Sequence, residues 1–304
     1  FDFYFTDFCI SFYTMKFYQS KWFYLFLLSI IWGSSFILIK RGLVGLSDYQ
    51  LGASRIVLTS LFLFSIGFKS VKQIKKKHWR WVAISGFVSS FFPPFLFAMA
   101  QKHIDSSVAS ILNSFTPLAT VIIGIILFNI VSSRRQIWGV FVGLIGTVFL
   151  ILAGAELHQN QNAWYSLLVV IATLGYAVNV NIIKKHLSDI SALAVTTGNF
   201  VFVFFPALGV LYFSGFFETI LDSKDMQVSL GYVAILSLFG TAFAKVVFNK
   251  LVQISSPVFA SSVTYTMPIV AVIWGLIDGE AFSFWQVLAA GIILFGVFLA
   301  NRKK

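Results

Sequence analysis

Charge is scarce in this sequence. Only 11% of the 304 residues are charged, while 58% are hydrophobic and the mean hydropathy is +0.88. A soluble domain averages about 25% charged residues, so this chain has too few polar groups to cover a soluble surface. Four stretches carry no charge at all: 106–133, 157–183, 190–217 and 251–277. Each exceeds the roughly 20 residues that a helix needs to cross the hydrocarbon core, so the sequence predicts an all-α membrane protein.

Other absences narrow the function. Cys9 is the only cysteine, which excludes a disulfide within the chain and a metal site built from cysteines. No aspartate or glutamate falls inside an apolar segment, and the four histidines lie at segment ends. The chain also lacks a phosphate-binding glycine loop and a histidine pair for zinc. These absences disfavour a membrane enzyme and an ATP-driven pump, so we expect no catalytic residues, no cofactor and no metal.

Ten apolar segments have the length of a membrane-spanning helix. They cover residues 22–40, 49–68, 79–100, 107–128, 136–153, 163–183, 191–213, 229–250, 257–277 and 284–301. The connections are short, and none resembles a soluble domain. Before the first span, residues 1–14 lack the pattern of a signal peptide. We expect them to be upstream sequence translated in frame, or a disordered leader, with Met15 as the start.

The basic residues predict how the chain is oriented. With the N-terminus inside, sixteen of the 22 lysines and arginines fall at the inner ends of the ten spans and only four at the outer ends. Cytoplasmic loops carry the positive excess, so both termini are predicted to be cytoplasmic, in a bacterial inner membrane. The basic run at 69–80 fits anionic lipid better than nucleic acid.

One apolar sequence motif occurs twice, 151 residues apart. Aligning 109–124 with 260–275 gives six identities in sixteen positions, among them Pro117 with Pro268. More weakly, "WGSSFILIK" in the first span resembles "YAVNVNIIK" in the sixth. Spans one to five therefore recur as spans six to ten.

This repetition predicts the architecture. Because five is odd, the second copy enters the membrane from the opposite side. We predict two five-helix repeats of inverted topology, residues 15–155 and 156–304, an arrangement typical of secondary transporters.

Several of these motifs also resemble a known family. "WGSSF" in span one, "ASRIVL" in span two, and "ASILNSFTPLATVIIGIIL" in span four with its copy in span nine resemble the EamA-type drug/metabolite transporter superfamily. The resemblance implies a ten-helix carrier in which spans five and ten buttress a central cavity lined by the others. Members of this superfamily move amino acids, other metabolites and drugs, and related branches move nucleotide sugars.

Ten residues are candidates for a substrate site: Trp32, Ser35, Asn113, Pro117, Tyr176, Asn179, Lys245, Thr264, Tyr265 and Pro268. Pro117 and Pro268 leave the carbonyls of Asn113 and Thr264 without a helical partner. Such paired breaks suit a binding site at the membrane midplane. They also suit plain kinks whose carbonyls bond to a neighbouring hydroxyl.

The remaining candidates contribute polar and aromatic groups. Asn179 aligns with Ser35, and Tyr176 aligns with Trp32. Three further asparagines lie in apolar segments, where hydrogen bonding between helices is the alternative role: Asn181, Asn199 and Asn249. The tandem Pro93 and Pro94 break span three and free the carbonyls of Ser89 and Ser90, as a gate hinge or as a simple bend.

Two cations, Arg55 and Lys245, fall inside predicted spans. Either could bind an anionic substrate group. Alternatively, each could extend to the nearer membrane surface, because both lie within about two turns of a span end.

These observations favour a secondary transporter that moves a small metabolite, such as an amino acid, by alternating access, with export as the expected direction. A drug exporter and a nucleotide-sugar-type exchanger remain alternatives among carriers. A non-transporting scaffold or sensor is the alternative from another class. The partners expected are the small-molecule substrate and the lipid bilayer, with no nucleic acid. The GxxxG at Gly139 to Gly143 permits close helix packing, within the chain or in a homodimer.

The orientation can be tested by cysteine labelling in intact cells, after Cys9→Ser removes the native thiol. Asn160→Cys and Gln227→Cys should react with a membrane-impermeant maleimide, because both positions are predicted to lie outside. Lys76→Cys should react only after the membrane is permeabilised. Labelling at position 76 in intact cells would overturn the predicted orientation.

Overall fold

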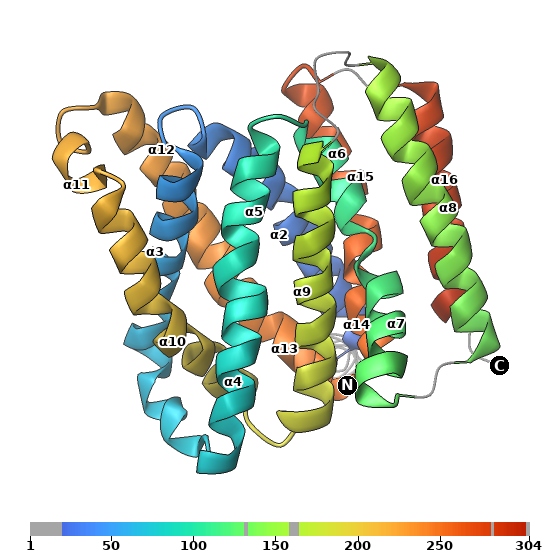
Figure 1. The fold of residues 1–304 in the computed structure, drawn as a ribbon, viewed down its shortest axis with the longest axis horizontal. Helices are drawn as coiled ribbons and strands as arrows, with labels where there is room; N and C mark the ends of the chain where they lie inside the picture. Colours follow the sequence, from blue (N-terminus) through green and yellow to red (C-terminus); the bar gives the residue numbers. More distant parts are fainter. Residues whose placement is uncertain (1–19, 131–132, 158–163, 281–282, 302–304) are drawn as a thin grey trace, which may run out of the picture.

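The computed structural model describes residues 20–130, 133–157, 164–280 and 283–301. Across these residues the chain is helical and contains no strand. Figure 1 shows most helices running in a similar direction, with their connections gathered at two ends. The predicted leader and Asn160 lie outside the described residues.

The elements follow one another in this order. They are α2 (Lys21–Gly42), α3 (Asp48–Gly67), η1 (Phe68–Gln73), η2 (Lys76–His78), α4 (Trp79–Gly86), η3 (Phe87–Phe91), α5 (Phe92–Gln101), α6 (Ser106–Asn113), α7 (Thr116–Phe128), α8 (Arg134–Leu157), α9 (Trp164–His186), α10 (Ala192–Phe213), α11 (Phe216–Thr219), α12 (Lys224–Ile235), η4 (Leu236–Phe243), α13 (Ala244–Ile254), α14 (Pro257–Ser261), α15 (Val263–Ile277) and α16 (Phe284–Asn301). The segments η3 and η4 are wider π-helical turns.

Eight helical stretches are long and apolar enough to cross a membrane. They are Lys21–Gly42, Asp48–Gln73, Lys76–Gln101, Ser106–Phe128, Trp164–His186, Ala192–Phe213, Lys224–Ile254 and Pro257–Ile277. These stretches coincide with predicted spans one to four and six to nine, which confirms a helical membrane protein. Helices α8 and α16 cover predicted spans five and ten. That these two also cross the membrane remains a prediction.

The helix boundaries follow local sequence signals. Helix α3 starts with a capping box, in which Ser47 and Gln50 exchange side-chain hydrogen bonds with each other's backbone N–H groups. Helix α7 ends at Asn129, whose φ of 53° is in the left-handed region that asparagine tolerates. Short loops connect most consecutive helices.

Helices α8 and α16 pack on each other at one edge of the molecule (Figure 1). Their backbones approach closely at glycines. A Cβ atom at Gly296 would lie 2.6 Å from the carbonyl oxygen of Gly139 and 2.9 Å from the Cα atom of Gly143. The small residues of the GxxxG sequence are therefore used within the chain, between the fifth and tenth predicted spans.

A buried ionic cluster joins the ends of three helices. Glu280 follows α15, and its side chain is only 4% exposed. Its carboxylate accepts hydrogen bonds from Nζ of Lys40 at the end of α2 (2.9 Å) and from Oγ of Ser107 in α6 (2.8 Å). The backbone N–H groups of Ser106 and Ser107 also donate to it, at 3.3 Å. Glu280 therefore caps the positive end of α6 from a distant part of the chain.

Asp278 also belongs to this cluster, because its Oδ2 lies 2.6 Å from Nζ of Lys40. Both acidic groups have a lowered pKa. A hydrogen bond from Lys40 lowers the pKa of Asp278. Burial raises the pKa of Glu280, but hydrogen bonds from Lys40 and Ser107 outweigh burial and keep this pKa below its usual value. A carboxyl group with a lowered folded-state pKa stabilises the fold above its unfolded-state pKa, about 4.3 for glutamate. That stabilisation is lost as the pH falls through the folded-state pKa.

We expect Glu280→Gln to lower the free energy of unfolding by about 2 kcal/mol at neutral pH, because Lys40 and the start of α6 lose a charged acceptor. The difference from the unsubstituted protein should shrink as the pH is lowered below about 4. Thermal unfolding in detergent, followed by tryptophan fluorescence across pH, measures both effects. Glu218→Gln, at an exposed position, is the control. Equal stability of the two variants at neutral pH would contradict the prediction.

Candidate functional site

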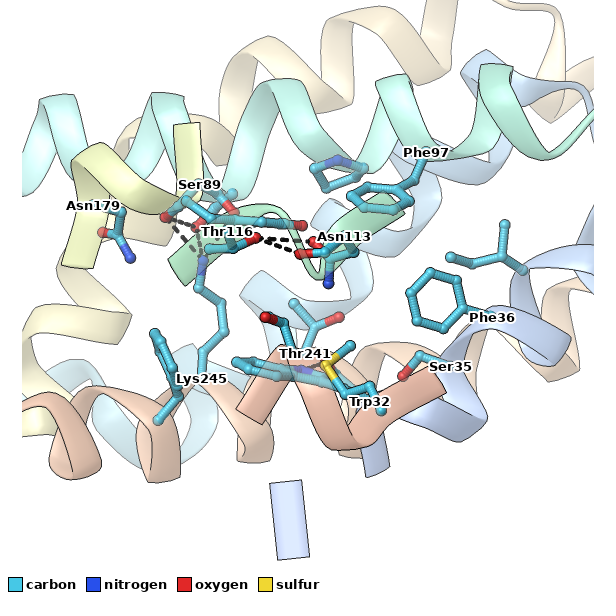
Figure 2. A pocket seen from close by; sticks show the side chains of 18 of the residues that line it. Trp32, Ser35, Phe36, Ser89, Phe97, Asn113, Thr116, Asn179, Thr241 and Lys245 are labelled. Atoms are coloured by element: carbon cyan, nitrogen blue, oxygen red, sulfur yellow. Dashed lines mark hydrogen bonds between the residues drawn. The ribbon is translucent and has the colours of Figure 1, made fainter. Parts of the chain in front are cut away.

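A cavity lies inside the helical bundle, between α2, α3, α5, α6, α9, η4, α13 and α15 (Figure 2). Seven of the ten candidates from the sequence line it: Trp32, Ser35, Asn113, Tyr176, Asn179, Lys245 and Thr264. These seven residues are spread over more than 200 positions of the sequence, so the fold brings them together. Several aromatic side chains complete the walls, among them Phe36, Phe97 and Phe248.

The other three candidates lie elsewhere. Pro117 is buried in the first turn of α7 and is not among the residues that line the cavity. Tyr265 and Pro268 border a second, almost wholly apolar pocket between α15 and α16. These two residues therefore lie outside the first cavity, and their role in binding substrate stays a prediction.

The two repeat-related proline breaks do not present free carbonyl groups. The chain is interrupted between α6 and α7, where the carbonyl oxygen of Asn113 accepts a hydrogen bond from Oγ1 of Thr116 (2.7 Å). The carbonyl oxygen of Thr264 accepts one from Oγ of Ser114 (2.8 Å). Neighbouring hydroxyls therefore satisfy both groups, which was the alternative stated above. The side chains of Asn113 and Thr264 nevertheless line the cavity.

A different break reaches the cavity. Pro93 cannot donate to the carbonyl of Ser89, and the chain widens into η3 just before it. Lys245 fills the gap, because its Nζ donates to the carbonyl oxygen of Ser89 (3.0 Å), to Oγ of Ser89 (3.0 Å) and to Oγ of Ser90 (2.6 Å). Figure 2 shows the side chain of Lys245 extended from α13 toward these serines. We call this contact the Lys245 latch.

The second wide turn, η4, makes a related contact. The carbonyl oxygen of Gly240 accepts a hydrogen bond from Nε1 of Trp32 (2.9 Å). The Trp32 ring also packs against Phe248, with 5.0 Å between ring centroids. A Cβ atom at Gly240 would lie 2.6 Å from Oγ of Ser35, so the close approach of α2 depends on glycine.

Arg55 and Lys245 do not extend to the membrane surface. Each is only 8% exposed, and both line the cavity. Nε of Arg55 donates to Oγ1 of Thr241 in η4 (2.9 Å). Within the described part of the chain, no carboxylate lies within 4.0 Å of either cation. The alternative in which these cations reach the surface is therefore wrong, because both heads are buried among polar groups of other helices.

The asparagines divide into two groups. Asn179 lines the cavity, and its Oδ1 accepts a hydrogen bond from Oγ of Ser85 (2.5 Å). Asn181 donates to the carbonyl of Thr120 in α7, and Asn249 donates to Thr196 in α10. The second group joins helices to one another, as the alternative role proposed.

The sequence left several lining residues unnoticed, above all Thr241 and Thr116. A signal for Thr241 was present. Thr241 lies 151 residues after Ser90, and Gly240 lies 151 residues after Ser89, which is the offset of the internal repeat. Extending the repeat alignment through the third and eighth spans would have placed η3 and η4 at equivalent positions.

A helical bundle of this kind, with a mixed polar and aromatic cavity at its centre, is the structure of a membrane transporter. The sequence profile of the EamA-like transporter family matches residues 20–152 and 163–302. The chain is therefore an integral membrane protein that belongs to the EamA-like transporter family, as the sequence motifs predicted.

Named relatives agree with this class. The chain is 26% identical over 290 residues to YedA of Escherichia coli K12, an uncharacterized inner membrane transporter, covering 92% of this chain and 90% of YedA. It is 24% identical over 289 residues to an uncharacterized transporter of Archaeoglobus fulgidus, covering 94% and 100%. It is 23% identical over 295 residues to an S-adenosylmethionine/S-adenosylhomocysteine transporter of Chlamydia muridarum, covering 93% and 92%.

A solved crystal structure with 15% sequence identity is also similar, with a TM-score of 0.65 over 93% of this chain and 96% of that one. At this identity the similarity shows the fold alone.

The Lys245 latch predicts an energetic coupling between two distant positions. Pro93→Ala supplies the N–H group that can donate to the carbonyl of Ser89. Lys245→Met should therefore destabilise the protein less, by about 1 kcal/mol, in the Pro93→Ala background than alone. A double-mutant cycle of thermal unfolding measures this coupling.

Pro206→Ala is the matched control for this cycle, because it restores an N–H group inside α10, for the carbonyl of Phe202, and leaves the carbonyl of Ser89 unchanged. It should couple more weakly to Lys245→Met. Strictly additive effects of Pro93→Ala and Lys245→Met would show that the latch does not satisfy the freed carbonyl.

Proposed function

We propose that this protein is a secondary carrier, a facilitator or exchanger, that moves a small metabolite such as an amino acid across the membrane by alternating access. The observation that carries the proposal is the central cavity, in which hydroxyl, amide and cationic groups lie among aromatic side chains. Small-molecule sites combine an apolar lining with a few such polar groups. Asn113 and Thr264 are the proposed contacts for substrate polar groups, and Lys245 is a fixed positive charge.

The proposed architecture is ten spans in two inverted repeats, residues 15–155 and 156–304. Two observations support it. The family profile matches two stretches of similar length. In addition, η3 shifted by 151 residues falls at 238–242, inside η4, so both halves carry the same unusual turn in the same place. Helices α8 and α16 would be the fifth spans of the two halves.

Contacts that join the two halves around the cavity support alternating access as the proposed mechanism. The hydrogen bonds that connect a residue of the first half with one of the second include Lys245 with Ser89, Trp32 with Gly240, and Ser114 with Thr264. The cluster around Glu280 adds a further connection at one end of the bundle. In the proposed mechanism, rocking one half against the other breaks some of these contacts and opens the cavity to one side.

The proposals for the substrate and for the direction of transport rest on different observations. The Chlamydia relative is named for S-adenosylmethionine and S-adenosylhomocysteine, which both contain an amino acid group. This name favours an amino acid or a derivative for the present chain. Export and a cytoplasmic position of both termini, in a bacterial inner membrane, rest on the sequence resemblance and on the distribution of basic residues.

Two other carriers remain candidates, a drug exporter and a nucleotide-sugar-type exchanger, because the apolar walls of the cavity fit either. A scaffold has no need for a cavity lined by polar groups, whereas a sensor would bind a ligand without moving it, so flux in proteoliposomes separates a sensor from a carrier. A homodimer is compatible with the fold. Thermal-shift screening of the purified protein against amino acids, S-adenosylmethionine, nucleotide sugars and cationic drugs separates the substrate classes, since a bound ligand raises the unfolding temperature.

The proposed mechanism predicts transport without proton coupling. A proton-coupled carrier usually relies on a carboxylate or histidine at membrane depth, and the described residues that line the cavity include neither. In proteoliposomes, flux of the substrate found by screening should follow its own gradient. An imposed pH gradient alone should not drive accumulation. Uphill uptake that requires the pH gradient and is abolished by an uncoupler would refute this mechanism.

A further inference from the structure

The cavity contains two buried cations and, among the described residues that line it, no anion. Burial of an unpaired charge is strongly unfavourable, and charged side chains within a membrane protein normally pair with an opposite charge or face a functional pathway. Arg55 and Lys245 lie on different helices, α3 and α13, and both face the same space. The cavity is therefore electrostatically incomplete without a negatively charged ligand.

The two cations differ in the donors that they have left. All three hydrogen-bond donors of the Lys245 ammonium have acceptors, the carbonyl and hydroxyl of Ser89 and the hydroxyl of Ser90. Lys245 therefore contributes charge, but no free donor, to the cavity.

Arg55 is in the opposite situation. A guanidinium carries five N–H donors, and among the described residues only Nε has an acceptor, Oγ1 of Thr241 at 2.9 Å. The terminal nitrogens have no such partner in the described part of the chain. The bond from Nε fixes the guanidinium at η4, and the side chain is more than nine-tenths buried.

We propose that the terminal nitrogens of Arg55 form a subsite for the carboxylate of the substrate, and that the substrate class is a small monocarboxylate with an apolar or aromatic body. This inference rests on the proposed carrier function. The planar end of a guanidinium binds a carboxylate through two parallel hydrogen bonds. Lys245 strengthens the attraction through its fixed charge. Phe36, Phe97 and Phe248 supply the surface for the apolar body.

A carboxylate fits this set of donors better than a phosphate does. A phosphate group has three terminal oxygens and is commonly bound by several backbone N–H groups at the start of a helix or by a cluster of cations. Here a single guanidinium end supplies the free charged donors, which matches the two oxygens of one carboxylate.

The experiment compares matched probes on the purified protein in detergent. The probes are 3-phenylpropanoate, its neutral amide 3-phenylpropanamide, L-phenylalanine and phenyl phosphate, and the readout is the ligand-dependent shift of the unfolding temperature. We expect at least one of the two carboxylates to stabilise the unsubstituted protein and the amide to have a much smaller effect. Equal stabilisation by the acid and the amide, stabilisation by phenyl phosphate alone, or no effect of either carboxylate would overturn the inference.

Variants at position 55 test the residue itself. Arg55→Gln keeps a donor for Thr241 but loses the charge, and it should weaken binding of the stabilising carboxylate at least about tenfold. Arg55→Lys keeps the charge without the paired donors. Its affinity for the carboxylate should fall between that of the unsubstituted protein and that of Arg55→Gln. Lys102→Gln is the control, because it removes one positive charge at an exposed ion pair with Asp48. Full retention of carboxylate binding by Arg55→Gln would overturn the role of Arg55.

The outcomes also separate this inference from the proposed function. Saturable flux of a neutral or cationic solute in proteoliposomes, without carboxylate binding, would retain the carrier and reject the subsite. Carboxylate binding that depends on Arg55, without flux of any bound carboxylate, would retain the subsite and reject the carrier.

Discussion

Backbone carbonyl groups that lose their helical partner inside a membrane must find another donor, because no water is available in the hydrocarbon core. This constraint organises the centre of the molecule. Proline removes the helical partner of the carbonyls of Ser89, Asn113 and Thr264. Each of these accepts a hydrogen bond from a side chain, as does the carbonyl of Gly240 in the wide turn η4. Three of the four donors come from a distant part of the chain. The interruptions therefore connect helices as well as bend them.

The same constraint explains where the cavity lies. Residues of η3, η4 and the α6–α7 break, among them Ser89, Gly240 and Asn113, line the cavity. Side chains that satisfy the released carbonyls line that space, since they must reach the same points. Lys245 and Trp32 consequently have two roles, as hydrogen-bond donors to the backbone and as walls of the cavity. Burial alone therefore does not show whether Lys245 and Trp32 serve the fold or the binding of substrate.

The sequence predicted the helical spans and several residues of the cavity, and the physical reason differs from residue to residue. Apolar length and the 151-residue repeat predicted the helical spans, because both are properties of contiguous sequence. The sequence also predicted that Pro93 frees the carbonyl of Ser89, since that loss depends on proline alone. It could not identify Lys245 as the new donor, 156 residues away, because that pairing depends on how the fold places η3 beside α13. Pro268 and Tyr265 border the second pocket and not the cavity, because helical spacing alone does not determine which neighbouring helix each face contacts.

The Lys245 latch has a consequence for how the protein is made. Ser89 is synthesised and inserted well before Lys245, so the carbonyl in the third span has no lysine donor while the first half is being built. The half that emerges first from the ribosome is thus left with an unsatisfied polar group in its interior. Its assembly can be completed only when the stretch Lys224–Ile254, which carries Lys245, enters the membrane beside it. Insertion of the later spans is in this sense the final folding step of the earlier ones.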